Sequence, residues 1–118
     1  MAAKSLKPIK PSLKEKKRYI AFEIISEKPI GKFASVSKAI WDSSLSFMGE
    51  LGVSKAGLWI LPEKWNEQKQ TGLLRVSNKS TAETKAALSL VKTIDGQKAT
   101  VKSKGTSGMI GKLAKYTE

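Results

Sequence analysis

The sequence contains no cysteine and no histidine, and acidic residues are scarce in it. Without thiols or imidazoles, the chain cannot form disulfides, thiolate metal sites or Ser-His and Cys-His nucleophiles, and it lacks the usual proton shuttle at neutral pH. The carboxylates that remain show no clustered acidic motif of the kind that a two-metal nuclease requires. We therefore expect no catalytic residues, no metal ligands and no cofactor bound by this chain.

Long apolar runs are also missing. No stretch reaches the length of a membrane span, and the N-terminus lacks the apolar centre of a secretory signal. We expect a cytoplasmic protein without a membrane partner. A hydrophobic fraction of 40% in 118 residues still allows one folded domain with a modest core.

Positive charge is what the chain has in abundance: 22 Lys and Arg side chains face 10 Asp and Glu, giving a net charge of +12. The excess lies at the ends, because residues 1–18 carry seven basic side chains and one acid, and residues 98–118 carry five and one. We predict a basic, flexible N-terminal arm over residues 1–17 and a single domain over residues 18–118. This charge favours a polyanionic partner, nucleic acid first, over the alternative that it only aids solubility.

Apolar periodicity and turn residues divide the domain into alternating elements. Gly52 is expected to stop the first helix, and a polar hairpin loop over residues 63–69, after Pro62, is expected to carry Trp65 near its tip. Ser80 and Glu83 have the spacing of a capping box at the start of the second helix. The predicted strands cover residues 18–26, 56–61, 71–77 and 98–104, and the predicted helices cover 35–51, 81–93 and 109–115.

This order predicts an α+β fold, the ferredoxin-like (RRM-like) βαββαβ sandwich. Its four-stranded antiparallel sheet would carry two helices on one face, with the C-terminal helix added at the end. One phasing of the strands turns Leu74, Val76, Ala99 and Val101 toward the helices. The same phasing leaves Arg75, Lys98, Thr100 and Lys102 on a free and basic face.

The junction Gly105-Thr106-Ser107-Gly108 joins the last predicted strand to the terminal basic helix. Small residues let a phosphate approach the backbone, and the first amides of a helix have no partners of their own. Lys102, Lys104, Lys112 and Lys115 would surround such an anion site. The alternative interpretation is a flexible connection into a helix.

Two familiar RNA-binding modules fit the sequence poorly. The third predicted strand has none of the aromatic residues on which an RNA-recognition motif stacks bases, and Glu23 would repel phosphate. KH modules clamp the backbone with a Gly-x-x-Gly loop between two helices, whereas this one joins a strand to a helix. We therefore expect contact with the RNA backbone instead of base reading on the sheet.

Four blocks of the chain, in matching order and spacing over about residues 14–116, together resemble archaeal ribonuclease P protein component 2. They are Lys17 to Ser26, Gly49 to Gly52, Thr71 to Val76, and Gly105 to Ile110. The family's pattern in the final block is Gly-x-Ser-Gly-Thr-Ile. Met109 departs from that pattern and lacks the hydroxyl, which leaves any phosphate contact by that hydroxyl in doubt.

The resemblance implies a non-catalytic subunit of the ribonucleoprotein that removes 5′ leaders from precursor tRNA. The RNA would carry the catalytic centre with its Mg²⁺ ions, and this chain would bind ribonuclease P RNA together with protein component 3 and other protein components, meeting precursor tRNA indirectly. Trp59 and Trp65 are candidates for a protein interface. The residues expected to contact RNA are Lys16, Lys17, Arg18, Arg75, Lys102, Lys104, Ser107, Gly108, Lys112 and Lys115.

Three alternatives share parts of this pattern. A ribosomal or other structural RNA-binding protein would have the same charge, size and missing chemistry. A pure protein-interaction module would bind with little dependence on salt. The terminal basic helix could also lie on a membrane surface, although it is short for that role.

Overall fold

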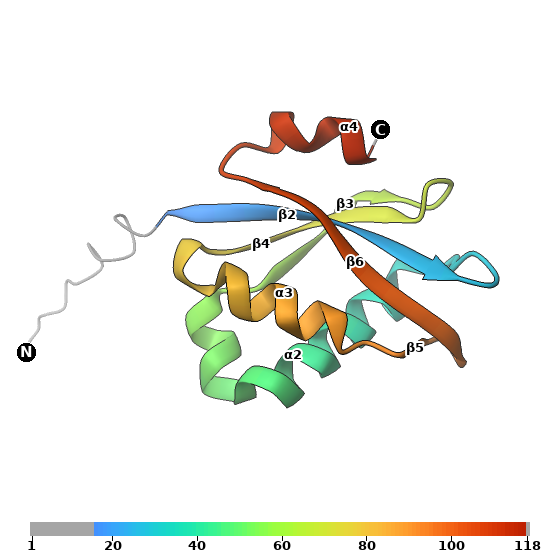
Figure 1. Ribbon diagram of the computed structural model, residues 1–118, viewed down its shortest axis with the longest axis horizontal. Coiled ribbons are helices and arrows are strands. Elements are labelled where there is room, and N and C mark those ends of the chain that lie inside the picture. The colour runs from blue at the N-terminus through green and yellow to red at the C-terminus, as the bar shows by residue number, and fades with distance from the viewer. Residues whose placement is uncertain (1–15, 118) are drawn as a thin grey trace, which may run out of the picture.

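The computed structural model describes residues 16–117, so the predicted N-terminal arm lies outside the described part except for Lys16 and Lys17. One five-stranded sheet, with every pair antiparallel, has the order β3-β4-β2-β6-β5 (Figure 1). The strands are β2 (Lys17–Ser26), β3 (Trp59–Asn66), β4 (Thr71–Ser77), β5 (Thr93–Ile94) and β6 (Gln97–Ser107). The helices are α2 (Phe33–Ala56), α3 (Thr81–Ser89) and α4 (Ala114–Thr117), with 3-10 turns η1 (Asn78–Ser80) and η2 (Ile110–Leu113).

The prediction of four strands was wrong because the chain after α3 forms a short additional hairpin. Asp95 and Gly96 have positive φ angles of 56° and 82°, which fold β5 tightly back onto β6. The second predicted helix therefore ends at Ser89 instead of extending into this hairpin. Its predicted capping box does not form either, because the side chain of Ser80 makes no capping hydrogen bond.

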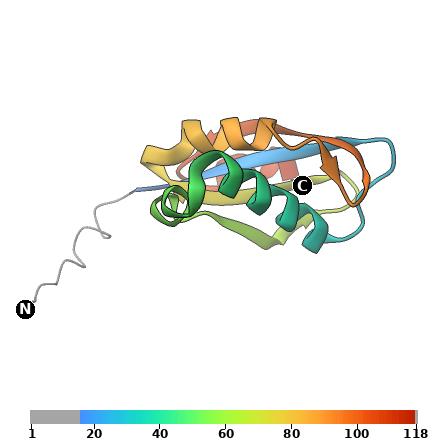
Figure 2. The ribbon, with the colours of Figure 1, turned by 90° about the horizontal axis from the view of Figure 1, so that it is seen from below.

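Helices α2 and α3 cover one face of the sheet and enclose the main core (Figure 2). Ile20, Phe22 and Ile24 on the central strand β2 are almost fully buried, as alternation along the strand predicts. Val36 and Ile40 on α2 meet them from the helical side. The prediction of which side chains of β4 and β6 point toward the helices is confirmed. The buried residues that these strands contribute to this core include Leu74, Val76, Ala99 and Val101.

Helix α2 is longer than predicted and is interrupted. Gly52 does not stop it; the helix continues to Ala56, where Gly57 ends it in the left-handed conformation at φ 61°. The interruption falls at Gly49, whose φ of 77° and ψ of 169° are not helical. Phe47, just before that break, is 47% exposed, although the apolar spacing of the helix would place it in the core.

Strand β3 continues through Pro62 to Asn66, well beyond its predicted end. Its pairing with β4 is irregular between Leu61 and Asn66, which changes the face to which the following side chains point. Trp65 therefore turns toward the helices, with its ring centroid 6.5 Å from that of Phe33. It is packed beside the core and is not at the tip of an exposed loop.

The other face of the sheet, here called the outer face, was predicted to be free, and this was wrong in part. The segment η2–α4 lies across it, opposite α2 and α3 (Figure 1). Leu113 is only 2% exposed there and joins a small second core with Ala21, Leu61 and Leu73. Asn66 Nδ2 on β3 donates to the carbonyl oxygen of Thr117 at 2.8 Å, which holds the end of the segment.

Candidate nucleic-acid interface

The Gly105–Gly108 junction is mostly strand. Gly105, Thr106 and Ser107 belong to β6 and pair with Ala21, Ile20 and Tyr19 of β2. The element that follows is a 3-10 turn and one turn of α-helix, which is too short to offer the predicted row of free helix-start amides. The amide of Met109 already donates to Ser107 Oγ at 3.1 Å. Any anion held here must therefore be bound mainly by side chains.

Gly105 is small because the C-terminal segment packs on it. A β-carbon at this position would lie 2.6 Å from Cε2 of Tyr116 and 3.3 Å from Cδ2 of Leu113. Carbon atoms do not approach so closely without displacement. This glycine thus allows η2–α4 to reach the sheet, which is a packing role and not the phosphate approach that the sequence suggested.

Gly108 lies against a cation. A β-carbon there would be 2.5 Å from Nη1 of Arg18. Arg18 also donates from Nε to Asn78 Oδ1 at 3.0 Å, just beyond the end of β4. The guanidinium thus lies across the end of the sheet, between the chain after β4 and the chain after β6, and places a positive charge at the predicted junction.

An open hollow of about 360 Å³ adjoins the end of β6. Its walls come from Gly105–Ser107 on one side and from Lys112, Lys115 and Tyr116 on the other. Both lysines are exposed, and Lys115 Nζ lies 5.2 Å from the centroid of the Tyr116 ring. Two flexible ammonium groups over a shallow hollow suit the backbone of a polyanion.

Lys102 and Lys104 belong to a separate group on the outer face. Lys102 is the register partner of Glu23, and Lys104 Nζ lies 3.4 Å from Oε1 of the same carboxylate. Glu23 is four residues along β2 from Tyr19, a distance of about 13 Å at strand rise. The carboxylate offsets part of the charge of this pair, so these lysines attract phosphate less than their number suggests.

The remaining predicted cations gather at the end of the sheet where β2 begins. Lys16 is exposed, and its carbonyl accepts a hydrogen bond from the amide of Asn78. Lys17 reaches across the sheet, with its Nζ 3.5 Å from the position of a β-carbon on Gly57. Arg75 lies on β4, in the neighbouring strand. The structure therefore brings together six of the ten predicted residues here: Lys16, Lys17, Arg18, Arg75, Ser107 and Gly108.

Pairing also aligns a row that sequence reasoning missed. Trp59 on β3 is the register partner of Arg75 on β4, Arg75 is the partner of Tyr19 on β2, and Tyr19 is the partner of Ser107 on β6. We call these four residues the outer-face row. The sequence did indicate that Trp59 points away from the core, because it alternates with the buried Leu58 and Ile60. Only the strand register shows that it lies beside Arg75.

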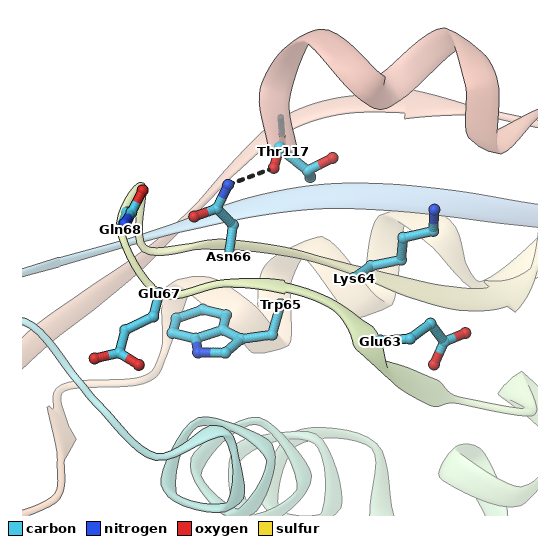
Figure 3. A pocket seen from close by; sticks show the side chains of 7 residues that line it. All are labelled: Glu63, Lys64, Trp65, Asn66, Glu67, Gln68 and Thr117. Carbon is cyan, nitrogen blue, oxygen red and sulfur yellow. Dashed lines mark hydrogen bonds between the residues drawn. The ribbon is translucent and has the colours of Figure 1, made fainter.

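A larger open pocket of about 540 Å³ lies elsewhere, along the second half of β3 and the turn after it (Figure 3). Glu63 and Glu67 outnumber Lys64 among its lining residues, so its charge does not suit a polyanion. In Figure 3 the Trp65 ring points away from α4 and toward the helical layer, whereas Asn66 points to Thr117. We take this pocket as part of the anchor of the C-terminal segment.

No group of three or more Asp and Glu side chains comes close enough together to hold a metal ion within residues 16–117. No helix in this range is both long and apolar enough to cross a membrane.

Comparison with known proteins now decides the family. The model of the Rpp14/Pop5 family matches residues 18–117, nearly all of the folded chain. The chain belongs to the Rpp14/Pop5 family. The resemblance inferred from the four sequence blocks is thereby confirmed.

Relatives of this Rpp14/Pop5 protein are named Ribonuclease P protein component 2. The protein from Thermococcus gammatolerans is 46% identical over 107 residues, which cover 91% of this chain and 87% of the relative. The protein from Pyrococcus furiosus is 41% identical with the same coverage. The protein from Methanosarcina acetivorans is 34% identical over 91% of this chain and 77% of its own length.

A solved structure has a similar fold. A chain in the cryo-EM structure of yeast ribonuclease MRP superposes on this Rpp14/Pop5 protein with a TM-score of 0.62. The alignment covers 79% of this chain and 74% of that chain, at 14% sequence identity. At that identity the likeness concerns the fold, here a mixed α/β domain with one antiparallel sheet.

Proposed function

We propose that this protein is a subunit of the ribonuclease P ribonucleoprotein and stabilises its catalytic RNA during removal of 5′ leaders from precursor tRNA. The observation that carries the proposal is its similarity to proteins named Ribonuclease P protein component 2, up to 46% identical over 91% of the chain. Membership of the Rpp14/Pop5 family over residues 18–117 supports the same assignment. We also propose that the complex acts in the cytoplasm.

The chain would act on the RNA by charge and shape. Compact folding of a large RNA brings phosphates together, and cations fixed on a rigid protein lower the cost of that approach. Arg18 supplies such a cation, because its Nε donates to Asn78 Oδ1 and its guanidinium lies beside Gly108. Lys112 and Lys115 supply further, exposed cations around the hollow at the end of β6. In this proposal the hydrolytic chemistry and its Mg²⁺ ions belong to the RNA, and the protein supports their scaffold.

We also propose that protein component 3 binds the helical side of the domain. Near its interruption at Gly49, α2 exposes Phe47 and Leu51, with 47% and 69% of their surfaces accessible. Large apolar side chains exposed together are typical of a protein interface. This side lies across the domain from the outer face (Figure 2), so a partner bound here would not cover the basic groups of the outer face. Leu51→Glu should therefore abolish copurification with component 3 without weakening binding to RNA alone.

We infer, in addition, a ferredoxin-like arrangement for the four long strands. Their order, β3-β4-β2-β6, with both crossover helices on one face, agrees with the split βαβ pattern. Strand β5 is then an addition at the outer edge of β6.

Reconstitution of precursor-tRNA cleavage tests the function. The RNA and the partner proteins would be assembled with and without this chain, and the cleavage rate would be measured over a range of Mg²⁺ concentrations. We expect omission to slow cleavage and to raise the Mg²⁺ requirement, because the phosphates then lose fixed cations. An unchanged rate and Mg²⁺ requirement would refute the proposal. Lys38→Ala is a matched control, since this exposed lysine on α2 pairs with Asp42 at 2.7 Å, away from the outer face.

A further inference from the structure

The outer-face row places a cation between two aromatic side chains. Residues that are register partners on neighbouring antiparallel strands have β-carbons about 4.5–5.5 Å apart. Arg75 therefore lies beside Trp59 on one side and Tyr19 on the other. Nε of Arg75 is buried, and it has no hydrogen-bond partner among residues 16–117. The register thus sets three planar side chains, those of Trp59, Arg75 and Tyr19, at one level on three adjacent strands, and we call these three side chains the platform.

The two ends of this platform differ. Tyr19 is half-buried, because it packs against the cluster that anchors the C-terminal segment. Trp59, on the edge strand, is 52% exposed and is the open end. A flat surface that is closed at one end and open at the other suits a single planar group that enters from the side of β3.

The charge around the platform identifies its occupant. Lys17 Nζ lies beside Gly57, two residues before Trp59 in the chain. The row itself contains no acid, and Glu23, further along β2, is engaged by Lys104. An aromatic face next to cations is the combination that binds unpaired nucleotides, whose bases stack and whose phosphates pair with the cations. A protein partner held mainly by apolar contact would not require this concentration of positive charge.

We propose that the outer-face row is a stacking site for one unpaired nucleotide of RNA. Its base lies on Trp59 and the Arg75 guanidinium, and its phosphate lies at Lys17. The proposal rests on the RNA-binding function given above and adds a base contact to it. Trp59 is thereby an RNA-binding residue instead of a protein-interface residue, and the sheet contacts bases despite the absence of aromatic residues from β4.

The test uses intrinsic fluorescence of the full chain. In the Trp41→Phe, Trp65→Phe double variant, Trp59 is the remaining tryptophan, and it would be titrated with a single-stranded oligoadenylate and with a duplex RNA of equal length. We expect the single strand to quench the fluorescence and the duplex to quench it little, because paired bases cannot stack on a side chain. Equal quenching by both RNAs, or quenching by neither, would overturn the proposal.

Affinity measurements on variants give the second test. Trp59→Ala should weaken oligoadenylate binding about five- to 150-fold, the range for loss of one stacked base, without changing the dependence on salt. Arg75→Lys keeps the positive charge but loses the planar guanidinium, so it should also weaken oligoadenylate binding without changing how steeply affinity falls with salt. Lys17→Ala should lower the salt slope by about one. Leu90→Ala is the matched control, since Leu90 is likewise 47% exposed but lies at the end of α3, away from the outer-face row.

Two outcomes separate this site from its rivals. If Trp59→Ala binds oligoadenylate within twofold of the parent protein but no longer copurifies with a partner protein, Trp59 is a protein contact and the proposal is wrong. If omission of the whole chain impairs precursor-tRNA cleavage while Trp59→Ala leaves oligoadenylate binding intact, the subunit function stands and only the stacking site fails. Circular dichroism melts would confirm that each variant is folded.

Discussion

Gly105→Ala is the sharpest test of why the junction is rich in small residues. The sequence suggested that Gly105 admits a phosphate, whereas the structure places it under the ring of Tyr116. Its φ is not among the positive values of the chain, so alanine can adopt the same backbone conformation. The substitution therefore adds one methyl group to the folded protein without straining its backbone.

The expected cost follows from that contact. The new β-carbon would lie 2.6 Å from Tyr116 Cε2, so the ring and the segment that carries it must move away from the sheet. Forcing an extra methyl group into a packed site costs about 1–3 kcal/mol. Replacing glycine by alanine also lowers the conformational entropy of the unfolded chain, which stabilises the folded protein by about 0.4–1 kcal/mol. Because a 2.6 Å contact with a ring carbon is severe, the cost should lie in the upper part of its range, about 2–3 kcal/mol. The free energy of unfolding should thus fall by about 1–2.6 kcal/mol, which corresponds to about 4–20 °C in Tm for a domain of this size.

Thermal unfolding followed by circular dichroism measures this change. Gly111→Ala is the matched control, because a β-carbon at Gly111 meets nothing within 4 Å. That variant should melt at the parent temperature or slightly above it. Adding Gly105→Ala to a Tyr116→Ala background should cost much less than adding it to the parent protein, since the clashing ring is gone.

Two results would refute the packing explanation. The first is a Gly105→Ala protein that melts within 1 °C of the parent. The second is an equal cost of Gly105→Ala with and without the Tyr116 ring. A variant that keeps its stability but loses RNA affinity would instead support direct approach of phosphate to the Gly105 backbone.

Three further predictions concern other parts of the chain. Glu23→Gln should raise RNA affinity and steepen its salt dependence, because Lys104 loses its ion-pair partner at 3.4 Å. Titration with RNA at several salt concentrations would test this. An unchanged slope of affinity against salt would contradict it. Gly108→Ala should push the Arg18 guanidinium aside and weaken RNA binding severalfold. The loss of stability should be small, because the end of a flexible side chain can move. A Tm loss as large as that of Gly105→Ala would show that the backbone had shifted. Gly49→Ala should lower the free energy of unfolding by about 1–3 kcal/mol, because only glycine readily adopts φ 77° with ψ 169°. Denaturant unfolding would measure this change. Equal stability would mean that α2 does not need this break.

Local patterns in the sequence were enough to place several elements. β4 covers residues 71–77, as predicted, and β2 begins one residue before its predicted start. Both strands alternate clearly, and the alternation also gave the correct inward face. Such features depend on neighbours in the chain, which is why they can be read without a structure.

Errors arose where distant segments decide the conformation. β3 passes through Pro62 because the proline falls in an irregular stretch of an edge strand, where a missing amide hydrogen costs little. The C-terminal residues 109–115 were predicted as a separate helix, and nothing local indicates that Leu113 is buried against Ala21. The outer face was therefore expected to be free although η2–α4 covers part of it.

The sequence was enough to choose which residues belong to the candidate site, but not how they are grouped in space. Its cations could be chosen from charge and family position. The register alone separates Lys102 and Lys104, beside Glu23, from the group around Arg18. The same holds for Trp59, since no local pattern tells that β3 brings it next to Arg75.

The place of β2 at the centre of the sheet also constrains how the protein is made. Among the strands of residues 16–117, β2 leaves the ribosome first, yet one of its edges is completed by β6, the last of these strands, with Tyr19 paired to Ser107. The sheet therefore cannot close during most of synthesis, and the nascent chain carries an open, apolar strand edge until β6 emerges. Contacts so far apart in the chain slow folding and favour misassociation. Shielding of that edge, by a chaperone or by an early partner, would raise the yield of native protein.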